Sequence, residues 1–406
     1  MKILAVNKFY YLKGGSEAYY FSLNNLLIEK GHVIIPFSMK DEKNLSNSYE
    51  EYFIENINYA DMDLKTKIIN SAKIVYSFEA HNKIRRIIRE TKPDIAHLHI
   101  FQHQLSPSII HALRKEGVPI VNTVHDLKVI CPNYKMLNSK GICEECKGGK
   151  YYNCFVNSCA KGSKLNSLVN MLEAYLHQYL KSYSYVDKYV CPSEFFKKKF
   201  IEFGIPENKV VCIPNFIDIK KFEPSYDSKD YFLYMGRLTE EKGIMTLIKA
   251  MEKVKELKLY ILGAGPLEEN LRKQVNDSKL ENIEFLGYKT GKELEYIIRN
   301  SKFVVLPSEL YENCPMSVIE AMAYGKAVVG SNIGGIPELI EDEITGLIFN
   351  AGDEIDLANK INCLINNPEK SVNMGKEGRL RAEKLYDKDK HYEKIDEIYK
   401  SILQHE

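Results

Sequence analysis

Residues 307–346, PSELYENCPMSVIEAMAYGKAVVGSNIGGIPELIEDEITG, decide the fold of this chain. The apolar run KFVVLP before them is typical of a buried parallel strand, and the loop that follows carries Glu312. Pro315 suits the first position of a helix, and the apolar pattern behind it ends at Gly325. The apolar face of this helix consists of Val318, Ile319, Met322 and Ala323. The segment is therefore predicted to run strand, loop, helix.

Two acids in this segment point to a ligand site. Ligands of open α/β sheets lie beyond the carboxyl ends of the strands, where the free N–H groups of a helix N-terminus favour phosphate. Glu312 lies in the loop, whereas Glu320 lies over one turn into the helix, at a rise of about 1.5 Å per residue. The two acids can therefore contact different parts of one elongated anionic ligand. For either acid alone, an ordinary loop or surface charge is the alternative.

Strand-like apolar runs alternate with helical patterns along the whole chain, which predicts parallel sheets covered by helices. The runs form two series, separated by a non-periodic segment between Pro214 and Pro224. The first series is KILAV, HVIIPF, IAHLHI, VPIVNTV, KYVCPS and KVVCIP, and the second is YFLYMG, KLYILG, IEFLG, KFVVLP and KAVVGS. We predict an α/β protein of two doubly wound, Rossmann-like domains.

The spacing of Glu312 and Glu320, followed by AMAYGKAVVGSNIGGIPELI, resembles the signature of glycosyltransferase family 4. Its members are retaining, nucleotide-sugar-dependent enzymes of the GT-B fold, in which two Rossmann-like domains face a central cleft. The resemblance covers nearly the whole chain. It implies an acceptor-side domain over 1–213, with a C-terminal helix at 387–406 packing back on it, and a donor-binding domain over 214–386.

Cations in the second domain suit a diphosphate. MGRLTEEKGIMTLIKA places Arg237 at the end of a strand and Lys242 just before a helix. Two fixed cations stabilise the charge that grows on a departing nucleoside diphosphate, and the pair matches the phosphate-binding Arg and Lys of the family. A surface salt bridge to Glu240 or Glu241 is the alternative for Lys242.

The resemblance assigns further donor contacts. It implies Glu320 on ribose hydroxyls and Glu312 on sugar hydroxyls. Other nucleotide-sugar contacts are expected at the helix N-terminus, from Asn313, Pro315, Met316 and Ser317. Gly263 and Gly265 in LYILGAG form a strand-to-helix turn that lies near the nucleotide base in the family. A dinucleotide fingerprint needs the full spacing and a downstream acid, which IEFLGY places poorly.

The first domain offers two candidate sites. Gly14 and Gly15 in KGGSEAYY allow close approach of backbone to a ligand before Ser16 and Glu17 begin a helix, so they fit a phosphate cradle, a capped turn, or both. His125 in TVHDLK resembles the Thr-His-Asp motif of the family, in which the His reaches the donor sugar; an imidazole bonded within its own loop is the alternative. For His97, His99 and His103, buried hydrogen-bonded histidines are expected rather than a metal site.

Four cysteines fall in one loop, KGICEECKGGKYYNCFVNSC, at Cys143, Cys146, Cys154 and Cys159. Two interpretations stay open: a tetrahedral structural zinc site, or free thiols in a cytosolic chain. The family has a similar insertion in some members, and its position suggests that it shapes the acceptor site. Asp61 and Asp63 imitate an Asp-x-Asp metal motif, but no buried strand precedes them, so we expect a solvated helix start.

Charge divides the chain. The net charge is +1, yet residues 1–213 hold 29 Lys+Arg against 21 Asp+Glu, and the remainder is acidic. A basic half suits nucleic acid, an anionic membrane or a phosphate-linked acceptor, and we favour the last two. The basic clusters Lys83, Arg85, Arg86, Arg89 and Lys197, Lys198, Lys199 fit membrane contact or solvated helix faces equally. We expect no signal peptide, no transmembrane helix, and a cytoplasmic protein at the inner face of the cell membrane.

These observations predict a retaining glycosyltransferase that moves a hexose from a UDP- or GDP-linked donor to a glycan or lipid-linked acceptor in cell-surface polysaccharide synthesis. No catalytic cofactor or metal and no nucleic acid is expected. The family is usually assigned same-face substitution, in which the departing phosphate deprotonates the acceptor. A nucleotide-sugar epimerase and a non-catalytic nucleotide-sugar-binding scaffold at the membrane are the alternatives.

Overall fold

The computed structural model describes residues 1–56 and 72–404, and Asp61 and Asp63 lie outside this part. The chain forms two compact units, residues 1–213 with 392–406 and residues 214–391. The last helix, α15 (Lys388–Leu403), lies within the range 387–406 expected for a C-terminal helix. The boundary between the units falls within this helix and not before it at residue 387.

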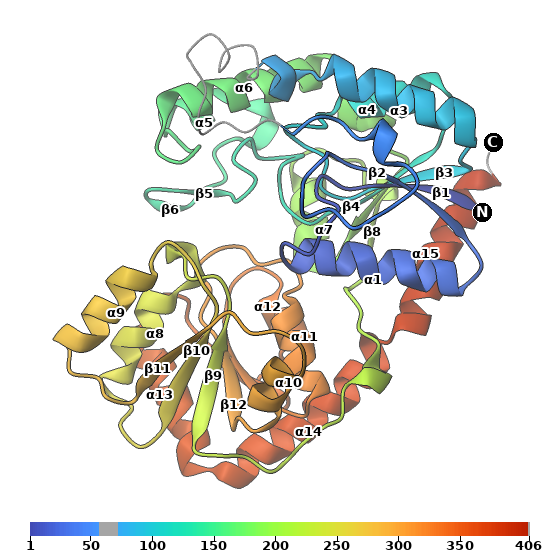
Figure 1. The fold of residues 1–406 in the computed structure, drawn as a ribbon. Coiled ribbons are helices and arrows are strands. Elements are labelled where there is room, and N and C mark those ends of the chain that lie inside the picture. The colour runs from blue at the N-terminus through green and yellow to red at the C-terminus, as the bar shows by residue number, and fades with distance from the viewer. Residues whose placement is uncertain (57–71, 405–406) are drawn as a thin grey trace. The chain divides into compact units, whose positions relative to one another are not determined.

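The first unit is built on a six-stranded sheet in which all strands are parallel (Figure 1). In order across the sheet, the strands are β2 (Val33–Phe37), β1 (Lys2–Val6), β3 (Ile95–Leu98), β4 (Ile120–Thr123), β7 (Lys188–Cys191) and β8 (Val210–Cys212). All of β3 and β4 is buried, as expected for central parallel strands covered on both faces.

Helices connect these strands. They are α1 (Gly15–Glu29), α3 (Phe78–Thr91), α4 (Ser108–Lys115), α5 (Tyr152–Val156), α6 (Lys164–Tyr179) and α7 (Glu194–Glu202). Serine caps mark three of them, because the hydroxyls of Ser77, Ser163 and Ser193 accept hydrogen bonds from the first turns of α3, α6 and α7. A small antiparallel ribbon, β5 (Leu137–Asn138) and β6 (Gly141–Ile142), precedes α5.

The second unit also has a six-stranded parallel sheet. In order, its strands are β11 (Ile283–Gly287), β10 (Lys258–Leu262), β9 (Tyr231–Met235), β12 (Phe303–Leu306), β13 (Ala327–Ser331) and β14 (Gly346–Phe349). The connecting helices are α8 (Ile244–Met251), α9 (Glu268–Asp277), α10 (Gly291–Arg299), α11 (Met316–Ala323), α12 (Ile336–Leu339), α13 (Glu354–Asn366) and α14 (Pro368–Leu385).

Two apolar clusters show that helices cover both faces of the second sheet. Phe232 and Tyr234 of β9 belong to the cluster that α8 and α13 complete, whereas Leu233 belongs to the cluster that α11 completes. This alternation follows from the two-residue period of a strand. The predicted doubly wound α/β class is confirmed for each unit. No helix in the described ranges combines the length and apolar character needed to cross a bilayer.

The strand order of the second unit places a topological switch between β9 and β12. Chain connections run from β9 outward to β10 and β11 on one side, and from β12 outward to β13 and β14 on the other. Because the loops after β9 and β12 leave the sheet in opposite directions, a crevice opens between them at the carboxyl edge, where α/β proteins bind ligands. The residues singled out around Arg237 and Glu312 follow these two strands.

Candidate functional site

Two loops meet at the switch point of the second unit. Lys242, at the end of the short helix η6 (Glu240–Lys242) after β9, places its Nζ 2.5 Å from Oε1 of Glu312 in the loop after β12. The hydroxyl of Ser308 donates to the same Oε1 at 2.6 Å. The predicted alternative, a surface salt bridge of Lys242 with its own-loop acids, is wrong, because the ion pair of Lys242 is with Glu312.

Gly243 makes the approach of these loops possible. Its φ is +66°, and a Cβ built on it would lie 1.8 Å from the carbonyl oxygen of Pro307, well inside contact distance. Any side chain would therefore push the start of α8 away from the β12 loop. A second link comes from the hydroxyl of Thr246, in the first turn of α8, which donates to Oε1 of Glu309 at 2.6 Å.

A third loop, after β13, supports Glu312 from behind. Gly334 has a φ of +60°, and its ideal Cβ would lie 2.4 Å from the carbonyl oxygen of Glu312. The N–H of Gly335 donates to that oxygen at 2.8 Å. Sequence reasoning did not assign these two glycines a role. Their signal was the Gly-Gly pair directly behind a buried strand.

Arg237 follows β9 directly and is exposed. Its carbonyl oxygen accepts a hydrogen bond from the hydroxyl of Tyr234 at 2.9 Å, which fixes the backbone while the side chain stays in solvent. Within residues 1–56 and 72–404 no ion pair involves its guanidinium. An exposed arginine on an anchored backbone at the switch point suits an anionic ligand.

Helix α11 begins one residue later than predicted. Pro315 is its N-cap, with φ −63° and ψ 120°, and Met316 is the first helical residue. The helix starts later because the extended ψ of Pro315 belongs to the loop after β12 and not to a helix. Asn313 lies in that loop, and Met316 and Ser317 supply first-turn N–H groups, which have no acceptor within a helix. Nδ2 of Asn215 holds the carbonyl oxygen of Cys314 at 2.9 Å, steadying the entrance to the helix.

Glu320 projects from the second turn of α11. Burial raises the pKa of its carboxyl group to about 7, so protonated and charged forms coexist near neutrality. A carboxyl group with a perturbed pKa beside a switch point is a candidate ligand contact. In the structure Lys242 contacts Glu312 directly. Arg237 lies in the loop after β9, and Glu320 lies on α11, which follows β12.

Gly263 and Gly265 have a visible packing role. Ideal Cβ atoms on them would lie 1.9 Å from the carbonyl oxygen of Gly236 and 2.3 Å from that of Leu238. The turn after β10 therefore packs against the loop that carries Arg237. These glycines shape the site by allowing two backbones to touch.

The glycine loop of the first unit differs in detail from expectation. Helix α1 begins at Gly15 with Gly14 as its N-cap, and the side chain of Ser16 forms no cap. The hydroxyl of Ser16 instead donates to Oε2 of Glu17 at 3.1 Å, and Glu17 is almost fully buried. The predicted helix start at Ser16 is one residue late, since α1 begins at Gly15.

His125 lies in a stack of buried imidazoles. Its Nε2 is 3.0 Å from Nδ1 of His99, and burial lowers its pKa to about 4, so the ring is neutral at pH 7. His97 stacks on His99 and hydrogen-bonds Thr123 through Nε2 at 2.7 Å. His103 is partly exposed, and desolvation lowers its pKa well below the usual value. The expected buried, hydrogen-bonded histidines are found at His97 and His99.

The cysteine loop does not form the zinc site that was one interpretation of it. No three or more His, Cys, Asp or Glu side chains in the described residues are grouped so that they could hold a metal ion. The turn after α5 brings the N–H of Cys159 to the carbonyl of Cys154 at 3.1 Å, and burial raises the pKa of Cys146 to about 12. Cys143 and the other three are free thiols.

The two basic clusters are occupied by ion pairs. Arg85 and Arg89 both bind Glu116, at 2.7 and 3.0 Å. Lys199 binds Glu144 at 2.9 Å, and the neighbouring rings Phe196 and Phe200 are buried. The structure therefore favours solvated helix faces over membrane contact at Lys83, Arg86, Lys197 and Lys198 as well, three of which also have acidic partners.

Comparison with known proteins gives two adjoining family matches. The model described as "Glycosyltransferase Family 4" matches residues 13–221, and "Glycosyl transferases group 1" matches residues 215–381. An uncharacterized glycosyltransferase of Methanocaldococcus jannaschii is 30% identical over 49% of this chain and 55% of its own length. The putative colanic acid biosynthesis glycosyltransferase WcaL of Escherichia coli is 28% identical over 47% of this chain and 50% of its own length. The similarity thus spans about half the length of these relatives.

Solved structures share the fold over the full length. Sucrose-phosphate synthase from Thermosynechococcus elongatus has a TM-score of 0.76 at 19% identity, with both chains covered completely. Anabaena HepE, solved with UDP and glucose, has a TM-score of 0.70 at 17% identity and covers 99% of this chain and 100% of its own. At these identities the likeness establishes the GT-B fold.

Proposed function

The chain belongs to glycosyltransferase family 4, and on this premise we propose that it transfers a sugar from a nucleotide-linked donor to an acceptor hydroxyl, with retention of anomeric configuration. The observation that carries the proposal is the 2.5 Å contact between Lys242 and Glu312 at the switch point of the second unit. It sets a cation and a carboxylate side by side where an α/β sheet receives its ligand.

The second unit is the donor unit in this proposal. Arg237 and Lys242 bind the diphosphate, and the first turn of α11, at Met316 and Ser317, adds N–H groups to it. Glu320 binds ribose hydroxyls. Because these groups are neutral donors, the carboxyl group accepts their hydrogen bonds without needing a counter-ion. Gly263 and Gly265 keep the loop after β10 close to Arg237, beside the base.

Glu312 has a double role in the proposed reaction. One of its oxygens already accepts from Lys242 and Ser308, which fixes the carboxylate, and the other is directed to sugar hydroxyls. Lys242 and Arg237 stabilise charge on the departing diphosphate, and this phosphate takes the proton of the acceptor hydroxyl as the new bond forms on the same face. His125 takes part as a neutral imidazole, because burial lowers its pKa to about 4.

The acceptor is assigned to the first unit. The relatives named for colanic acid and O-antigen synthesis support a glycan acceptor of the cell surface. Structures of HepE with UDP and UDP-glucose support UDP as the donor nucleotide, with GDP as the second choice. Gly14 and Gly15 form the backbone entry to α1, where an anionic group of donor or acceptor can approach.

We propose that the protein contacts an anionic membrane through a surface other than the two basic clusters. Large apolar side chains are exposed along α5 and α6, here named the α5–α6 face: Tyr152, Phe155, Val156, Leu165, Leu172 and Tyr179. Exposed Lys150, Lys161 and Lys181 flank these helices. Apolar side chains flanked by lysines suit the interface of an anionic bilayer. Free thiols are typical of proteins in the reducing cytoplasm. We therefore propose that this face contacts the inner leaflet of the cell membrane.

Thermal-shift measurement against UDP- and GDP-linked hexoses tests the proposal, because a ligand that binds only the folded state raises the midpoint by mass action. A donor that stabilises the protein is then supplied with glycan acceptors and the anomeric configuration of the product is read by NMR. An inverted product would contradict retention. Absence of any shift with every nucleotide sugar would contradict the donor site itself.

A further inference from the structure

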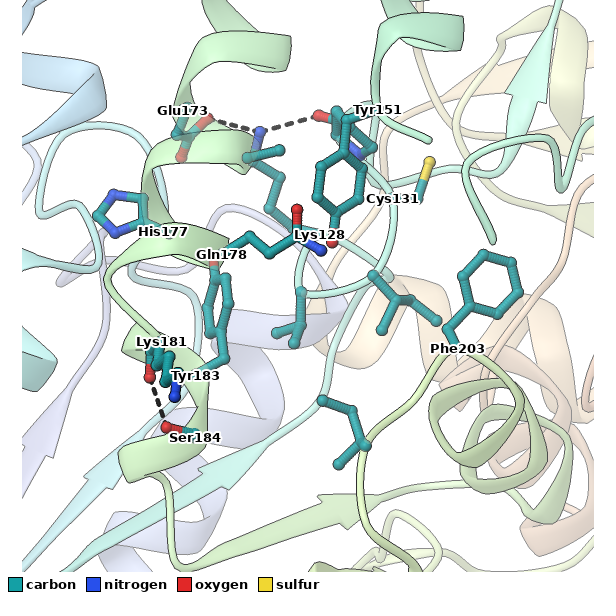
Figure 2. A pocket seen from close by; sticks show the side chains of 15 residues that line it. Lys128, Cys131, Tyr151, Glu173, His177, Gln178, Lys181, Tyr183, Ser184 and Phe203 are labelled. Carbon is teal, nitrogen blue, oxygen red and sulfur yellow. Dashed lines mark hydrogen bonds and ion pairs between the residues drawn. The ribbon is translucent and has the colours of Figure 1, made fainter. Parts of the chain in front are cut away.

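A cavity in the first unit has no part in the proposed donor site. It has a volume of about 140 Å³ and lies between the loop after β4, helix α6 and the end of α7. One wall of the cavity consists of residues 128–132, which come soon after His125 in the sequence (Figure 2). This volume equals that of about four or five water molecules, at roughly 30 Å³ each.

A buried ion pair lies in the cavity wall. Nζ of Lys128 is 2.7 Å from Oε2 of Glu173, and the two side chains are only 4% and 2% exposed. Figure 2 shows them directed at each other from the loop and from α6. Lys128 also donates to the carbonyl oxygen of Pro132 at 2.8 Å. Burial raises the pKa of Glu173, and the lysine opposes this shift.

One oxygen of the pair is left over. Both carboxylate oxygens of Glu173 are buried without a hydrogen-bond partner in the described part of the chain, and only Oε2 is compensated, by its ion pair with Lys128. The ammonium group of Lys128 has three N–H donors, and its two contacts leave one. A buried acceptor with no donor is unfavourable, so a ligand or water that supplies one is stabilised here.

The charge balance selects the class of ligand. The buried ion pair is neutral as a whole, so a charged group beside it would add an uncompensated charge at a desolvated place. Lys181 also lines the cavity, but it is exposed to solvent. A hydroxyl group fits both remaining sites, since it donates to Glu173 and accepts from Lys128. Adjacent hydroxyl groups on one rigid ring meet this requirement without a net charge.

The rest of the lining fits the carbon skeleton of such a ring. Tyr151, Tyr183 and Phe203 are aromatic, and Ile130 and Ile205 are aliphatic. Gln178 adds a further polar side chain at the mouth, where it is exposed. Sites with apolar walls and a few fixed polar groups bind neutral polar molecules with defined orientation.

We propose that this cavity is a binding site for one neutral, hydroxyl-rich sugar ring, whose hydroxyl-bearing edge contacts Glu173 and Lys128 and whose carbon face packs on Tyr151 and Phe203. The ring is either a free monosaccharide or the end residue of a glycan. Its interpretation as a subsite for an acceptor glycan rests on the proposed function, whereas its binding of a sugar ring does not.

Ligand-observed NMR with the full-length protein and no nucleotide tests this directly. The probes are the methyl α-pyranosides of glucose, galactose and mannose, with glucuronate and glucosamine as charged comparators. We expect saturable binding of at least one neutral glycoside, and charged comparators roughly tenfold weaker, a difference of about 1.4 kcal/mol. Occupation by water alone, seen as no saturable signal from any neutral glycoside, would overturn the proposal.

Two variants test the location. Ala174→Leu fills the cavity from α6 with a residue of good helix propensity, and we expect binding roughly tenfold weaker or lost. Phe203→Ala removes a partly exposed wall with little risk to folding and should weaken binding severalfold. Asn166→Leu adds bulk on the exposed first turn of the same helix and serves as the control. Equal binding by Ala174→Leu and Asn166→Leu would place the sugar elsewhere and overturn the proposal.

The two sources of the ring are separated by length. A disaccharide methyl glycoside that binds at least as well as the monosaccharide supports a glycan end, and weaker binding supports a free sugar. A UDP thermal shift is measured on the same samples, because the donor site lies in the other unit. Loss of sugar binding with UDP binding intact defeats only this inference, whereas loss of UDP binding alone defeats only the donor assignment.

Discussion

Lys242 and Glu312 touch through Nζ and Oε1 at 2.5 Å, although they belong to loops behind different strands, β9 and β12. The contact closes the two sides of the switch point into one polar surface. It also leaves each group partly shielded, with 27% of the lysine and 11% of the glutamate side chain exposed. In the proposed reaction a donor diphosphate shares the lysine with Glu312, so recognition of the sugar and of the phosphate would be coupled.

This coupling predicts the kinetics of single and double variants. Lys242→Ala should lower kcat roughly 10²–10³-fold, as removal of one charge-stabilising donor does. Glu312→Ala should lower kcat far more than it weakens nucleotide binding. Because the residues contact each other, the double variant should lose less than the product of the single losses.

The pair Lys289 and Glu293 on the same unit supplies the control for that cycle, with a 2.6 Å contact in which the glutamate side chain is 61% exposed and therefore screened by solvent. Alanine at either position should leave kcat unchanged. Independent, multiplicative effects at Lys242 and Glu312 would show that the contact has no part in turnover.

Gly243 predicts a steric effect separate from backbone strain. Its φ is +66° and its Cβ direction is blocked by Pro307, while Gly287 has a φ of +72° with open space around it. Gly287→Ala should cost about 1 kcal/mol of unfolding free energy from φ alone. Gly243→Ala should cost more and also weaken UDP binding. Urea unfolding and UDP titration check both, and equal costs would mean that the loops are not in contact.

Buried histidine predicts the acid limb of stability. The pKa of His125 is about 4 in the folded protein and about 6.5 when unfolded, so the unfolded chain takes up its proton first as pH falls. Its contribution is complete above about pH 6.5 and is lost toward pH 4, up to about 3 kcal/mol.

Urea unfolding of wild type and His125→Gln at several pH values between these limits isolates this contribution from that of His177, whose pKa is lowered in the same direction. The variant should lose less stability on acidification. Parallel pH curves for the two proteins would mean that His125 is exposed enough to titrate normally.

The α5–α6 face predicts membrane partitioning. Leu165→Gln with Leu172→Gln should reduce sedimentation with phosphatidylserine vesicles, since both side chains are at least half exposed. Salt should weaken wild-type binding through the flanking lysines. Leu380→Gln, at an exposed leucine of the second unit, is the control. Unchanged sedimentation of the double variant would contradict this assignment.

The fold could be predicted because strong, regular signals specify it. All eleven apolar runs became strands, from β1 to β13, and α15 lies within its expected range of 387–406. Strand β14 was missed because TGLIF is short and follows an acidic turn, and β5 and β6 were missed because two-residue strands have no periodicity. Helix α1 begins one residue before its predicted start at Ser16, because Gly14 caps it without a side-chain hydrogen bond.

The candidate site could be predicted only as residue types. Sequence reasoning named Arg237, Lys242 and Glu312, but which side chains touch depends on strand order, and the order places β9 beside β12. The support of Glu312 by Gly334 depends on a backbone contact across loops, which no local pattern encodes. The Lys128–Glu173 pair joins residues far apart in the sequence, where spacing gives no signal.

Calorimetric titration of UDP into wild type, Arg237→Ala and Arg272→Ala tests the central claim most directly. Arg272 is an exposed arginine on α9, paired with Glu268 at 2.8 Å, so its removal controls for lost charge. The account predicts saturable UDP binding by wild type and Arg272→Ala, and affinity at least roughly tenfold weaker, about 1.4 kcal/mol, for Arg237→Ala. Equal affinity of all three proteins for UDP would contradict a diphosphate site at the carboxyl ends of β9 and β12.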